Sequence, residues 1–172
     1  WLAIADDCFQ DQAQYFKAHE DCNGYQWLTL YHMLRYALSR PDFTIFENGN
    51  ARRLADYAIM SMDNFGYSVT YGDTGAYVGW WSELPVLHAI EWYYRDGRAA
   101  WALEKKIARS GRLATGEFAT RSTPAAPSDL IGALAFPLDP GYYRALGGPN
   151  SLPEERAFEK VVFRSGFEPE ND

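Results

Sequence analysis

Long apolar runs and clusters of basic residues are both absent from this sequence. No apolar run reaches the roughly 18 residues that a membrane-spanning helix needs, so no membrane span is predicted. The chain has 23 acidic residues against 16 basic ones, which gives a net charge of −7. This balance argues against nucleic acids and anionic membranes as partners. It does not exclude an acidic polymer, because a local groove can oppose the overall charge.

Cysteine is scarce as well. Cys8 and Cys22 are the only two, and they lack the spacing of a zinc-ligand set. We therefore expect no metal and no cofactor. Two cysteines leave open whether they pair or remain thiols. No signal peptide is recognisable, although one preceding Trp1 would lie outside this sequence.

Aromatic residues, in contrast, are abundant. The chain contains 6 Trp, 12 Tyr and 10 Phe, which together make up 16% of its residues. A core rich in aromatic rings explains this content most simply. A carbohydrate groove is the alternative, because the apolar C–H faces of sugars stack on aromatic rings.

The first two thirds of the chain show helical periodicity. Apolar residues recur three and four positions apart, which predicts helices over 4–18, 26–39, 51–63, 82–95 and 99–109. Ile4, Cys8 and Leu38 are among the residues expected to face inward. His32 and His88 are read as core histidines. Arg52 and Arg53 begin a helix, where the helix dipole disfavours cations, which suggests a carboxylate partner for them from the protein or from a substrate.

The amino-acid composition changes after this helical part. Residues 111–154 hold most of the nine prolines and many glycines, which predicts a long connector with short helical turns. The run "KVVFRS", within residues 155–172, is β-branched and reads as a strand. Because one strand is not stable alone, its partners are expected beyond Asp172 or outside this chain.

Two stretches of sequence resemble a known family. The first runs from "HEDCNGYQWLTLYHMLRYAL" through "RPDFTIFENGNARRLADYAIMSM" to "YGDTG", and the second is "FEKVVFRSGFEPEND". Both are similar to the heparinase II/III-like polysaccharide lyases, which include related alginate lyases. The resemblance implies a mainly α fold: part of an α/α toroid over 1–110, a Pro/Gly-rich connector over 111–154, and the first strand of a β-sandwich over 155–172.

The resemblance also implies a reaction. Members of this family cleave acidic polysaccharides by β-elimination, in which a base removes the proton at C5 of a uronic acid. Tyr25 matches the catalytic tyrosine of the family, a general acid/base. The Asn that neutralises the substrate carboxylate would lie before Trp1, and a second His would lie beyond Asp172. The chain is therefore expected to be inactive without the rest of its polypeptide or a complementary chain.

Further candidates for contact with an acidic polysaccharide or oligosaccharide lie near these motifs. His19 and Glu20 could orient the phenol or touch substrate, or could simply be exposed at a helix entrance. Asp73 could bind a sugar hydroxyl or hold its own loop through an Asx turn. Trp80 and Trp81 are adjacent, so their side chains would point about 100° apart on a helix and at most one would face a groove.

Two other functions remain open from the residues alone. An α/α-toroid glycoside hydrolase would use paired carboxylates, with Asp73, Glu20 or Asp21 as the acids. A non-catalytic helical module that binds carbohydrate or acts as a scaffold would need no catalytic group. If the substrate is an acidic polysaccharide, a periplasmic or secreted location is expected.

Overall fold

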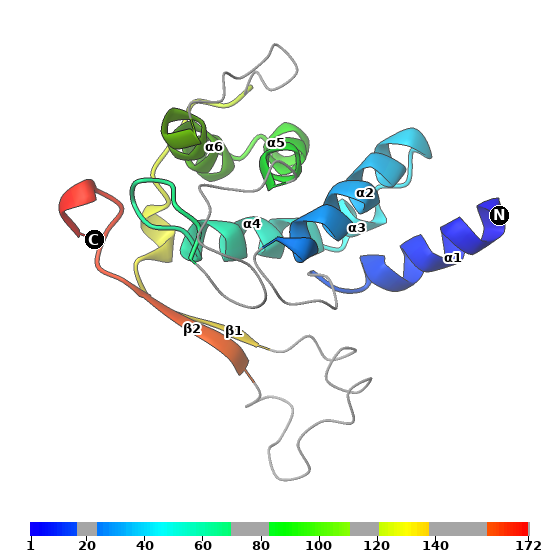
Figure 1. Cartoon of the computed structure of the whole chain (residues 1–172), viewed down its shortest axis with the longest axis horizontal. Helices are drawn as coiled ribbons and strands as arrows, with labels where there is room; N and C mark the ends of the chain where they lie inside the picture. Colours follow the sequence, from blue (N-terminus) through cyan, green and yellow to red (C-terminus); the bar gives the residue numbers. More distant parts are fainter. Residues whose placement is uncertain (17–23, 70–82, 111–120, 138–157, 172) are drawn as a thin grey trace, which may run out of the picture.

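The computed structural model describes residues 1–16, 24–69, 83–110, 121–137 and 158–171, and this part of the chain is mainly helical (Figure 1). The α-helices are α1 (Leu2–Ala13), α2 (Tyr25–Ser39), α3 (Thr44–Glu47), α4 (Asn50–Met60), α5 (Glu83–Tyr94) and α6 (Gly97–Ser110). The other elements are the strands β1 (Gly132–Pro137) and β2 (Phe158–Arg164) and two short 3-10 helices, Ser128–Leu130 and Pro169–Asn171.

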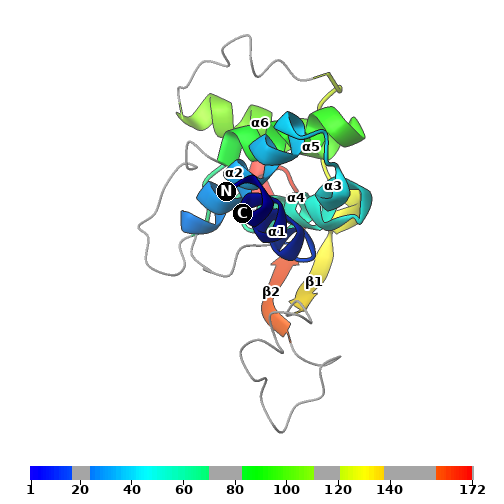
Figure 2. The same ribbon diagram turned by 90° about the vertical axis from the view of Figure 1, so that its right-hand side faces the viewer.

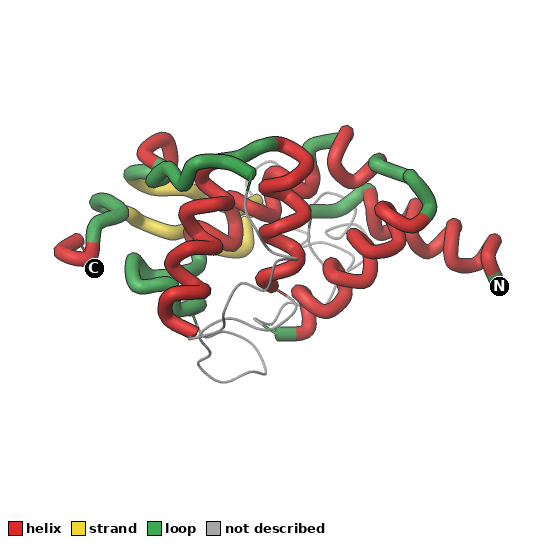
Figure 3. Tube along the Cα trace, turned by 90° about the horizontal axis from the view of Figure 1, so that it is seen from above, coloured by secondary structure: helices red, strands yellow, loops and turns green. Residues whose placement is uncertain are grey.

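The helices pack around one apolar core. α5 contacts α2, α4 and α6, and α4 also contacts α3 and α6. Figure 3 shows α5 and α6 side by side, as expected for consecutive helices joined by a short turn. The buried stripe of α2 explains why this segment is helical, since its members recur at helical spacing: Gln26, Trp27, Leu30, Met33, Leu34 and Ala37.

The first helix is shorter and more exposed than its sequence pattern predicts. α1 ends at Ala13 and buries only Phe9 and Ala13 within its bounds, so its first turns extend away from the other helices (Figure 1). The prediction that Ile4 and Cys8 face inward is wrong, because Ile4 is 58% exposed and Cys8 is an exposed free thiol. Leu38 is also exposed, at 46%, because it lies near the end of α2.

The strand predicted near the end of the chain finds its partner within the chain. β2 pairs with β1 in an antiparallel two-stranded sheet, with Gly132 opposite Arg164 and Leu134 opposite Val162. The prediction that the partner lies beyond Asp172 is therefore wrong. This hairpin projects from one side of the helical body (Figure 2).

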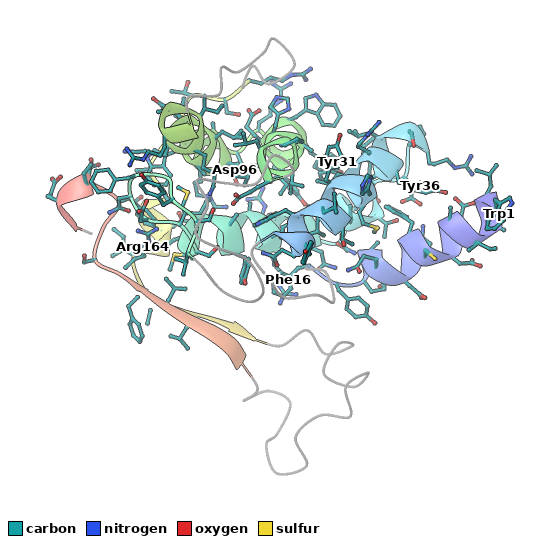
Figure 4. The ribbon with its side chains drawn as sticks, in the orientation of Figure 1. Trp1, Phe16, Tyr31, Tyr36, Asp96 and Arg164 are labelled. Carbon is teal, nitrogen blue, oxygen red and sulfur yellow. The ribbon has the colours of Figure 1, made fainter. Side chains whose placement is uncertain are left out.

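Arg164, the last residue of β2, fixes the sheet to the helices. Its guanidinium donates hydrogen bonds to Asn64 Oδ1 at 2.6 Å and to the carbonyl oxygens of Ile59, in the last turn of α4, and Met62, just past that helix. A cation is favoured there, because a helix C-terminus carries partial negative charge. Figure 4 shows Arg164 reaching the helical body at this junction. The ring of Phe167 also packs edge-on against that of Trp101, with 5.4 Å between the ring centroids.

None of the described helices combines the length and apolar character needed to cross a membrane.

Candidate functional site

Tyr25 is the first residue of α2, and its side chain is 44% exposed. The two residues that follow it, Gln26 and Trp27, are fully buried and fix the rotation of the helix. Successive helical residues point about 100° apart, so burying these two turns Tyr25 toward the surface. The phenol is therefore reachable by a ligand and is not sealed in the core.

The other residues proposed for substrate contact cannot be placed beside Tyr25. His19, Glu20, Asp73, Trp80 and Trp81 all lie outside the described residues, as does Asp21. Their grouping around Tyr25 stays a prediction.

A buried ion pair connects the residues on either side of segment 70–82. Lys106, on α6, is fully buried, and its Nζ lies 3.0 Å from Glu83 Oε1 and donates to Ser68 Oγ at 2.8 Å. Ser68 in turn donates to Glu83 Oε2 at 3.2 Å. The three groups satisfy one another in a buried site, where an unpaired charge would be costly.

Lys106 is a residue that the sequence reasoning missed. A lysine within "EKKIARS" reads as solvent-exposed, yet Lys106 falls on the buried stripe of α6 formed by Ala99, Ala102 and Leu103. The spacing of three, four and seven residues is the feature that could have identified it as an inward-facing cation.

A second charged cluster surrounds Arg98, at the beginning of α6. The guanidinium lies 3.2 Å from Asp56, 3.0 Å from Asp96 and 2.8 Å from Asp129. Burial raises the pKa of Asp56 despite the nearby Arg98. Burial acts in the same direction on Asp96, but hydrogen bonds from the side chain and backbone N–H of Arg98 outweigh it and lower the pKa of Asp96.

The Arg98 guanidinium holds this cluster together. The guanidinium occupies the space between the three carboxylates and neutralises part of their charge. In the part of the chain that the structure describes, no group of His, Cys, Asp and Glu side chains has the arrangement of a metal site.

A groove of about 460 Å³ runs between α2 and α5, and we call it the α2–α5 groove. It is lined by Tyr31, Leu34, Arg35, Leu38, Pro85, His88, Ala89, Trp92 and Arg121. On each helix the lining residues recur three, four and seven positions apart, so each helix contributes one face. No carboxylate is among these lining residues. Tyr31, on the α2 side of the groove, is labelled in Figure 4.

Two histidines and two arginines have surroundings that match the expectations only in part. His32 is exposed, which makes its assignment as a core histidine wrong, and His88 is half-buried at the groove. Among the described residues no ion pair joins Arg52 or Arg53 to a carboxylate, and their guanidiniums lie over aromatic rings, at 4.6 Å from the centroid of Tyr94 and 4.4 Å from that of Phe16. A carboxylate partner from a substrate stays a prediction. Cation–π contact with these rings stabilises the cations at the helix start.

Comparison of the chain with protein-family models, with curated proteins and with solved structures finds no match.

Proposed function

We propose that this chain is part of a polysaccharide lyase that cleaves uronic-acid-containing polysaccharides by β-elimination, with Tyr25 as its general acid/base. The exposed position of the Tyr25 ring at the first residue of α2 is the observation that supports this proposal. A phenol that exchanges a proton with a polymer must be reachable from solvent and held by a rigid element. The exposure of Tyr25 and its place in a helix are consistent with both conditions.

One tyrosine can carry out both proton transfers of the proposed reaction. A tyrosinate oxygen removes the proton from C5 of the uronate, the electron pair of that bond forms the C4–C5 double bond, and the glycosidic C4–O bond breaks. The phenol formed in the first step then returns its proton to the leaving oxygen. The uronate carboxylate must be neutralised meanwhile, and in this proposal residues outside the chain do so.

We further propose that the helices belong to a partial α/α toroid and that the β1–β2 hairpin begins a second, β-rich domain. The packing of α5 against both α2 and α6 supports a helical array. The Arg164 contacts with the end of α4 support a defined junction between the two parts. In this arrangement His19, Glu20, Asp73, Trp80 and Trp81 contribute to substrate binding. A periplasmic or secreted location follows from the proposed substrate class.

The experiment compares Tyr25→Phe with Tyr31→Phe in the longer polypeptide from which we propose this chain comes. Tyr31 is a matched control, since it is a partly buried tyrosine on the same helix. Loss of a general acid/base is expected to lower kcat about 10²- to 10⁴-fold with a smaller change in KM. Tyr31→Phe is expected to retain most of the activity.

Two outcomes would count against the proposal in different ways. Unchanged turnover by Tyr25→Phe would show that another group transfers the proton. Saccharide binding without any cleavage by the wild-type polypeptide would favour the non-catalytic binding module.

A further inference from the structure

The lining of the α2–α5 groove combines aliphatic and aromatic side chains with two cations. Leu34, Leu38, Pro85 and Ala89 supply aliphatic surface, and the aromatic rings of Tyr31 and Trp92 come from opposite helices. Arg35 belongs to α2, whereas Arg121 belongs to a segment beyond α6 that returns to α5. The volume of about 460 Å³ lies within the range of small-molecule sites, about 300–1,000 Å³.

Both guanidiniums are positioned by neighbouring rings. Arg35 lies 5.4 Å from the centroid of Tyr31 and donates to its hydroxyl at 3.2 Å. Arg121 lies 5.6 Å from the centroid of Trp92. Neither guanidinium has an ion pair with a carboxylate of the described residues. Two cations lining one groove without an acidic partner among the described residues are notable in a chain of net charge −7, because acidic side chains are plentiful.

Glu91 precedes the groove residue Trp92 on α5, but its carboxylate has other hydrogen-bond partners. Its side chain is fully buried, and its Oε1 accepts hydrogen bonds from the backbone N–H groups of Arg121 and Ser122 at 3.0 and 2.8 Å. The Ser122 hydroxyl donates to the same oxygen at 2.6 Å. Glu91 therefore fixes the backbone of Arg121 and leaves its guanidinium available to an anion from outside.

The aliphatic lining of the groove determines which class of anion it can bind. Sugar hydroxyls placed against leucine, proline and alanine would lose hydrogen bonds to water without replacing them, which is unfavourable. A flat apolar ring needs no hydrogen bonds there and can pack on the aromatic side chains of the lining. We propose that the α2–α5 groove binds an aromatic carboxylate. The ring of the ligand lies on the aliphatic lining, and its carboxylate lies at Arg35 and Arg121. This site is independent of the role of Tyr25.

Calorimetric titration of the chain tests the site with three probes: naphthylacetate, its neutral analogue naphthylacetamide, and a uronate trisaccharide. The acid is expected to bind at least about fivefold more tightly than the amide, because only the acid can pair with the guanidiniums. Arg35→Gln and Arg121→Gln are each expected to weaken binding of the acid about two- to fivefold. The amide should bind these variants as it binds the wild type.

Arg53→Gln is the matched control, because Arg53 is also an exposed arginine over an aromatic ring but lies on α4 and does not line the groove. It is expected to leave the affinity for the acid unchanged. Equal binding of acid and amide, no binding of either, or unaltered affinity in both groove variants would overturn the proposal. Tighter binding of the trisaccharide than of naphthylacetate would also overturn it, by making the groove a saccharide site.

Discussion

Replacing Lys106 by methionine removes a fully buried ammonium group while keeping a side chain of similar length. In the native protein this ammonium lies 3.0 Å from Glu83 Oε1 and donates to Ser68 Oγ at 2.8 Å. The variant leaves Glu83, which is itself buried, with Ser68 as its remaining partner in this group of three. An uncompensated carboxylate in the core is far less favourable than a paired one.

The expected cost follows from this geometry. Breaking a buried ion pair by removing one partner costs about 3–5 kcal/mol of the free energy of unfolding, whereas replacing both partners by neutral groups often costs little. Lys106→Met and Glu83→Gln are therefore each expected to cost several kcal/mol, and the double variant clearly less than their sum. Against a total stability of about 5–15 kcal/mol, each single variant is expected to lose between about a fifth of that stability and all of it.

Urea unfolding followed by circular dichroism measures these differences, and the double-mutant cycle isolates the coupling between the two residues. Lys105→Met is the control, because Lys105 precedes Lys106 on α6 but is only partly buried, with its Nζ 5.5 Å from the ring centroid of Trp101. It is expected to cost less than about 1 kcal/mol. Equal costs at positions 105 and 106, or additive effects of Lys106→Met and Glu83→Gln, would refute the reasoning.

Three further predictions concern backbone fit, the sheet junction and pH. Gly66→Ala is expected to lower the free energy of unfolding, measured by thermal unfolding, by more than about 2 kcal/mol, because a Cβ at φ +93° would lie 2.7 Å from the Lys105 carbonyl. Gly49→Ala is the control: its φ is +85° but the space around it is open, so it should cost only about 1 kcal/mol. Arg164→Gln is expected to speed hydrogen exchange in β1 and β2 but not in α2, since it removes contacts that fix the hairpin; equal acceleration in both would contradict this. The pKa of Asp96 is lowered in the folded protein, so its ionised carboxylate stabilises the fold above about pH 4, the pKa in the unfolded chain, and this contribution disappears as the pH falls through the folded pKa. The difference in free energy of unfolding between wild type and Asp96→Asn should therefore shrink in acid. A difference that does not change with pH would contradict this.

Helical periodicity predicted most of the helical part, because each helix is encoded by its own local pattern. The helices expected over 26–39, 82–95 and 99–109 correspond to α2, α5 and α6. The four-residue helix α3 was missed, since one turn is too short to show periodicity. The inward assignment of Ile4 failed for another reason: periodicity identifies an apolar stripe but not whether any neighbour covers it.

Contacts between distant segments were harder to predict. β1 has the sequence "GALAFP", in which glycine, alanine and proline favour strands weakly, and its pairing with β2 depends on long-range packing. The α2–α5 groove combines Arg35 with Arg121, and no local pattern relates two such residues. Tyr25 became a candidate through a resemblance between sequences, and its catalytic role stays a prediction; the structure adds that the residue is exposed at the start of a helix.

The mass of the cleavage products tests the central proposal most directly. The longer polypeptide is incubated with a uronic-acid polysaccharide, and the products are analysed by mass spectrometry. β-Elimination places a double bond in the new non-reducing end, so these fragments should be one water molecule lighter than hydrolysis products, and Tyr25→Phe should abolish them. Fragments that have gained water would contradict the lyase proposal and favour a glycoside hydrolase with paired carboxylates.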